Sequence, residues 1–89
     1  MRAPARRLPL SGGTAHTGGC TFAGYTVRET AGAAAVVTIH DGTSATGALL
    51  ATIGLAADAS DQHDCAVYAA TGVFIEVVSG TVEGSVFVA

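Results

Sequence analysis

The chain has 89 residues, a formal net charge of −3 at pH 7 and 49% hydrophobic residues, with no tryptophan. This length predicts one domain with a modest core, because such a small domain buries only about 60–65% of its unfolded-state surface. The longest apolar stretch, Ala31 to Ile39, is too short for a membrane helix, and the start of the chain lacks the apolar core of a secretory signal. We therefore expect a soluble protein made in the cytoplasm.

Residues 1–19 are rich in Pro, Gly, Ser and Thr and show no hydrophobic periodicity, which predicts an extended arm outside the folded domain. Three of the four basic residues lie in this arm, whereas the rest of the chain is acidic. A solvated arm and a docking arm both fit this pattern. Nucleic acid is not the expected partner, because the acidic body would repel it. For docking, the candidate residues are Arg2, Arg6, Arg7, Leu8, Pro9 and Leu10.

Alternation of apolar and polar residues from residue 20 onward predicts β-strands. The first three span Cys20 to Thr30, Ala33 to His40 and Ala48 to Leu55. Asp41-Gly42 is a turn signal between the second and the third. Within the third strand, one core-facing set is expected, namely Leu49, Ala51, Ile53 and Leu55.

Residues 57–64, A-D-A-S-D-Q-H-D, are polar and predict either a short exposed edge strand or a loop, before an apolar strand over residues 65–70. The segment mixes metal-ligand types, namely Asp58, Asp61, His63, Asp64 and Cys65. Their spacing matches neither a paired zinc site nor an EF-hand loop, so we expect a solvated acidic loop and no metal. Cys20 and Cys65 are expected to be free thiols, with a disulfide between them as the alternative.

The segment Gly72 to Val88 predicts a closing β-hairpin with Ser79 and Gly80 in its loop. That register pairs Val73, Ile75 and Val77 with Val86, Gly84 and Val82 on the core face. On the other face it sets Glu76 opposite Glu83. Like charges facing each other are destabilising, so we expect the two carboxylates either to splay apart into solvent or to be compensated by a cation, from Arg28 or from another chain. Glu76 and Glu83 therefore join the candidate partner-binding residues.

Short strands with turn signals every 8–12 residues predict a small antiparallel β-sandwich or jelly-roll-like domain of six or seven strands over residues 20–89. Catalytic patterns are incomplete. Ser44 in G-T-S-A-T-G misses the G-x-S-x-G elbow, His63 near Cys65 lacks an orienting third group, and Glu76 with Glu83 lacks a cleft. We expect neither an enzyme nor a cofactor.

Two stretches carry a resemblance to a known group of proteins: R-E-T-A-G-A-A-A-V-V-T-I-H-D-G-T-S-A-T-G-A-L-L-A-T-I-G-L-A-A, residues 28–57, and G-V-F-I-E-V-V-S-G-T-V-E-G-S-V-F-V, residues 72–88. Together they resemble small β-sandwich proteins encoded among the structural genes of tailed bacteriophages, of the head decoration or minor capsid type. The resemblance covers residues 20–89 and departs from the group in the acidic segment before and at Cys65. It implies a sandwich on the outside of a virion, often a trimer, without assigning functional residues.

We therefore expect a virion structural protein, a decoration or cement protein that binds the major capsid protein or another virion protein and stabilises the shell. Its arm would reach along a neighbouring subunit, and deleting residues 2–10 would leave the sandwich folded but abolish association. One alternative is a protein of the tail or the head-tail junction. The other is a carbohydrate-binding adhesion module, whose aromatic platform would be Tyr25 and Tyr68.

Overall fold

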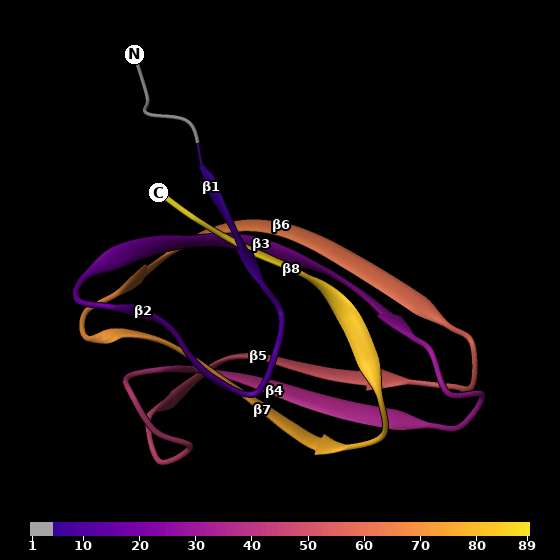
Figure 1. The fold of residues 1–89 in the computed structure, drawn as a ribbon. Helices are drawn as coiled ribbons and strands as arrows, with labels where there is room; N and C mark the ends of the chain where they lie inside the picture. The colour runs from indigo at the N-terminus through magenta and orange to yellow at the C-terminus, as the bar shows by residue number, and fades with distance from the viewer. Residues whose placement is uncertain (1–4) are drawn as a thin grey trace.

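The computed structural model describes residues 5–89, which contain eight β-strands and no helix. The strands are β1 (Arg6–Pro9), β2 (Gly13–Thr17), β3 (Cys20–Glu29), β4 (Ala35–Asp41), β5 (Ala48–Leu55), β6 (Ser60–Ala69), β7 (Gly72–Ser79) and β8 (Val82–Val88). Sheet A has the order β1-β8-β3-β6 and sheet B the order β2-β7-β4-β5. The two antiparallel sheets lie face to face as two layers (Figure 1). The all-β prediction is confirmed. Residues 20–89 contain six strands, β3 to β8, and two further strands come from the segment that was expected to be an arm.

The core lies between the two sheets. In β4 the predicted alternation places Ala35, Val37 and Ile39 inside, each at most 1% exposed. In β5 it fails at Leu49, which is 60% exposed. The register explains this difference, because Ile39 pairs with Ala51 but His40 pairs with Leu49, which leaves one extra residue in β5. Such a bulge reverses the faces on one side of it.

The predicted closing hairpin is wrong. β7 pairs with β2 and β4 in sheet B, whereas β8 pairs with β1 and β3 in sheet A. The turn at Ser79–Thr81 therefore carries the chain from one layer to the other. Val73 and Val86 do lie in the core, as expected, but they enter it from opposite sheets. Glu76 and Glu83 consequently do not face each other.

Gly80 makes this crossing possible, with a φ of +83° and an added Cβ that would lie 2.5 Å from the Cβ of Ala35. We expect Gly80→Ala to lower the free energy of unfolding by about 2 kcal/mol, through left-handed strain and this collision. Urea denaturation measures the loss. Gly32→Ala is the matched control, because Gly32 has a φ of +76° but an added Cβ there would meet nothing within 4 Å. Equal losses in the two variants would show that the contact with Ala35 is unimportant.

The N-terminal segment is part of the sandwich over residues 6–17, so the prediction of an arm outside it is wrong there. β1 is the outer strand of sheet A beside β8, and β2 is the outer strand of sheet B beside β7. Leu10, which follows β1, is only 4% exposed and lies in the core. Both segments are short and carry few apolar residues, so no periodicity identifies them as strands. Arg2 lies outside the described residues.

Residues 60–64 of the acidic segment lie in an edge strand, β6, which is one of the two alternatives expected. This strand is longer than expected, because it continues without a break through the apolar residues that were predicted to form a separate strand. The Tyr25 hydroxyl, in the core-facing layer of β3, donates a hydrogen bond of 2.9 Å to Asp61. Burial, together with this hydrogen bond, raises the pKa of Tyr25 to about 12.

Cys20 and Cys65 are both free thiols, as expected. In the part of the chain described, no helix has the length and apolarity needed to cross a membrane.

A buried carboxylate ties two turns together. Glu29 is 2% exposed, and it accepts backbone N–H bonds from Asp58 at 2.8 Å, from Gly32 at 2.9 Å, from Ala33 at 3.2 Å and from Ala31. These donors lower the pKa of Glu29, with Asp58 contributing most and burial opposing them. One side chain thus joins the β3–β4 turn to the β5–β6 turn.

Asp41 has the same role at the opposite end of the sandwich. Its carboxylate accepts N–H bonds from Thr71 at 2.9 Å, Ala70 at 3.0 Å and Gly72 at 3.4 Å. These bonds, Thr71 first, lower its pKa. The Asp-Gly signal therefore marks a turn whose aspartate also holds the β6–β7 turn.

Candidate functional site

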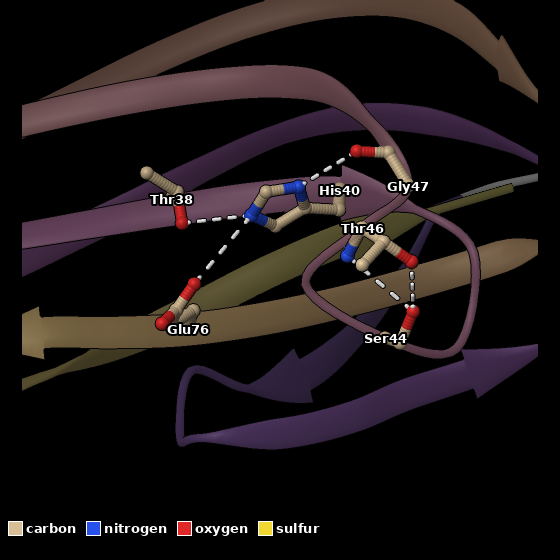
Figure 2. Close-up of polar contacts among 6 residues, drawn as sticks. All are labelled: Thr38, His40, Ser44, Thr46, Gly47 and Glu76. Atoms are coloured by element: carbon tan, nitrogen blue, oxygen red, sulfur yellow. Dashed lines mark hydrogen bonds and ion pairs between the residues drawn. The ribbon is translucent and has the colours of Figure 1, made fainter.

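The outer face of sheet B carries a compact polar cluster around His40. Because side chains alternate along β4, Thr38 and His40 share the face opposite the core. The Thr38 Oγ1 lies 2.8 Å from His40 Nε2, and the carbonyl oxygen of Gly47 lies 2.9 Å from Nδ1. Figure 2 shows the imidazole held between these groups, with the β4–β5 loop curving beside it. His40 is only 6% exposed although it lies on an outer face.

The hydrogen-bond partners set the chemistry of this histidine. A carbonyl can only accept, so Nδ1 carries the proton given to Gly47, and Nε2 of the neutral ring accepts from Thr38. The Glu76 Oε2 lies 4.0 Å from Nε2 (Figure 2). A protonated ring would therefore form an ion pair with Glu76. The hydrogen bond between His40 and Gly47 fixes the β4–β5 loop to sheet B. Glu76, a candidate residue from the sequence, lies beside this histidine.

Ser44 and Thr46 occupy the loop itself. Their hydroxyl oxygens lie 2.7 Å apart, and the Thr46 N–H contacts the Ser44 Oγ at 3.4 Å (Figure 2). Both are exposed. These bonds are those of a turn, in agreement with the interpretation of the sequence as turn chemistry.

Glu83 has a cation beside it, as one alternative for the Glu76–Glu83 pair predicted. Glu76 takes no part in this contact, because it lies in the other sheet. It pairs with Arg28 in the register of β3 and β8, and an Arg28 nitrogen lies 2.7 Å from its Oε1. Both side chains are more than 60% exposed. Because exposed ion pairs contribute about 0–1 kcal/mol, this pair has little effect on folding.

The other candidate residues divide between surface and core. Arg6, Arg7 and Pro9 are exposed, Leu8 is half-buried and Leu10 is buried in this chain's own core. Arg7 donates a hydrogen bond of 3.3 Å to the Ser85 hydroxyl of β8. Apolar contact with a partner through Leu10 is therefore not available in this fold.

The outer face of sheet A is hollowed into an open depression. Its polar lining includes Thr26, Arg28, Ser60, Gln62 and Glu83, from strands β3, β6 and β8. Sequence reasoning did not identify this surface, because β6 was not recognised as a neighbour of β3. In residues 5–89 no group of three or more His, Cys, Asp or Glu side chains is arranged to hold a metal ion.

The two tyrosines that would form a sugar platform do not lie together on the surface. Tyr25 is 7% exposed and Tyr68 is 72% exposed. Only Tyr68 is therefore available to stack on a ligand.

Comparisons with protein-family models, with curated proteins and with solved structures found no match.

Proposed function

We propose that this protein is a virion structural protein of the decoration or cement type, which binds the outer surface of an assembled bacteriophage capsid and stabilises it. The observation that carries the proposal is the outer face of sheet A, where polar and charged side chains gather over an open depression. Such a surface suits docking against another protein, because interface rims are polar and accessible to solvent. The resemblance of residues 20–89 to phage head proteins supplies the class of partner.

In this proposal the charged side chains of the outer face of sheet A orient the protein on its partner and contribute little to the stability of the fold. Arg28 and Glu83 present both signs side by side. Arg7 pairs with Phe87 in the register of β1 and β8, and its side chain reaches Ser85, two residues from Glu83 along β8. Charges at an interface rim mainly set docking geometry and association rate. Many identical copies on a shell make weak single contacts sufficient.

The test is co-sedimentation with shells assembled from the major capsid protein of the same genome. We expect Arg28→Glu to weaken association about tenfold, a loss of about 1.4 kcal/mol, while the circular dichroism spectrum is retained. Arg6→Glu is the matched comparison, with the same change of charge at a residue that contacts His16 of sheet B instead. If Arg28→Glu binds as well as the unaltered protein, the sheet A face is not the docking surface. If Arg6→Glu is equally weak, docking uses the β1 edge.

A place in the tail or at the head-tail junction is the alternative within the same class. The same docking face would serve there, but at far fewer positions. Quantitative mass spectrometry of purified virions separates the two, because hundreds of copies indicate decoration, whereas six or twelve indicate the tail.

A further inference from the structure

β5 is an edge strand whose second half, residues 51–55, has no bulge, charge or proline to hinder pairing. Within residues 5–89 it is hydrogen-bonded to β4 on one side and to no strand on the other. Its eight residues, A-L-L-A-T-I-G-L, include no charge and no proline. An exposed, uncharged edge of this length is a template for another strand.

The other three sheet edges in residues 5–89 differ from β5. β1 has four residues, including Pro9, which has no N–H to donate. β2 is interrupted by an irregularity between Thr14 and His16. β6 carries Asp61 and Asp64. The bulge of β5 lies close to its start and leaves residues 51–55 in regular register with β4.

We propose that β5 pairs antiparallel with β5 of a second copy of this chain, about a two-fold axis near Thr52, so that sheet B continues through the dimer. Pairing of identical strands requires that no like charges face each other. β5 meets this requirement because it has none. The same surface is used on both copies, as two-fold symmetry demands.

The surroundings of β5 favour the antiparallel arrangement. Among the described residues, five large hydrophobic side chains are exposed, and Leu49, Val67 and Tyr68 are three of them. They lie toward the end of the sandwich at which β5 begins and β6 finishes, because Asp41 both pairs with Ala48 and accepts a bond from Ala70. The edge strands β5 and β6 form one side of the sandwich, and this end of that side is apolar.

The opposite end of that side is acidic. β5 finishes at Leu55, and the turn that follows carries Asp58 and leads to Asp61. An antiparallel dimer places the acidic end of one copy beside the apolar end of the other. The two acidic ends are then separated by about the length of the strand, roughly 24 Å for eight residues. This exceeds the Debye length of about 8 Å at physiological ionic strength, so their repulsion is screened.

The test is the mass of the isolated full chain, measured by sedimentation equilibrium over a range of concentrations. We expect reversible conversion from one chain to two. Thr52→Lys, at an exposed position in the middle of β5, brings two ammonium groups together at the axis and should weaken the dimer about tenfold or more. Thr14→Lys is the matched control, since Thr14 is exposed on β2, the other edge of the same sheet. It should leave the dimer unchanged.

Amide hydrogen exchange of the unaltered protein gives a second measurement that does not depend on a variant folding. Protection in β5 should increase with concentration, while protection in β2 stays constant. A single-chain mass at every concentration would overturn the proposal, as would a three-chain mass or a dimer that Thr52→Lys leaves intact. Capsid binding through sheet A is independent of this contact, so Thr52→Lys should still bind shells through that face.

Discussion

Replacing Glu29 by Gln is expected to lower the melting temperature by more than about 10 °C. The carboxylate accepts four backbone N–H bonds at the junction of two turns. In glutamine an NH2 group replaces one of the two carboxylate oxygens. This group is a donor, and it would face the backbone N–H donors. It leaves buried N–H groups unpaired, and each such group is costly. Thermal unfolding followed by circular dichroism measures the loss.

The pH dependence gives the same interaction a second signature. Hydrogen bonding, above all from Asp58, lowers the folded-state pKa of Glu29. Its stabilising contribution is therefore complete above the unfolded-state pKa of about 4.3 and is lost as pH falls through the lower folded-state pKa. The difference in melting temperature between Glu29→Gln and the unaltered protein should be largest near neutral pH and should shrink below about pH 4.

Glu83→Gln is the control for this experiment, because Glu83 is exposed and pairs only with Arg28. Its melting temperature should change by no more than about 3 °C. If Glu29→Gln behaves like Glu83→Gln, the turns do not depend on the buried carboxylate.

Replacing Leu10 by Ala is expected to lower the free energy of unfolding by about 3 kcal/mol. Leu10 is 4% exposed and belongs to the core cluster, so truncation leaves a cavity between the sheets. Urea denaturation at constant pH measures the loss. Leu49→Ala is the matched control, since Leu49 is 60% exposed, and its effect should stay within about 0.5 kcal/mol. Similar losses in the two variants would mean that the segment after β1 is not anchored in the core.

The anchoring of Leu10 changes the expected result of a truncation. From sequence, deleting residues 2–10 should leave the sandwich folded. In the structure the deletion removes β1 and a core side chain, and it uncovers the edge of β8. We now expect the truncated chain to be destabilised, so point variants such as Arg28→Glu are the better test of shell binding.

Alternation predicted most of the residues that enter the core, with Leu49 beyond the β5 bulge as an exception, but it did not predict which strands pair. Val73, Ile75 and Val86 are buried as expected. A hairpin within one sheet and a crossing between two sheets bury the same alternate residues, so the pattern cannot separate them. At the crossing, Gly80 packs against Ala35, a contact between residues 45 positions apart in the sequence. Such a contact leaves no local signal.

The candidate site was predictable only in part, because it also depends on which strands pair. The alternation in β4 already sets Thr38 and His40 on one face, but nothing in the sequence shows that Glu76 pairs beside Thr38. Arg28 was expected near Glu83, and the register of β3 and β8 places it there. The depression on sheet A needs β6 beside β3, and the polar composition of β6 concealed that strand.

The order of strands in the two sheets has a consequence for how the chain folds. Of the strand pairs, only β4 with β5 joins neighbours in sequence, whereas β1 pairs with β8 and β2 with β7. Nearly the whole chain must therefore be looped before sheet A can close, and loop closure costs entropy before any contact offsets it. Topologies of this kind fold in milliseconds to seconds. On the ribosome, β1 has no strand to pair with until β8 has been synthesised.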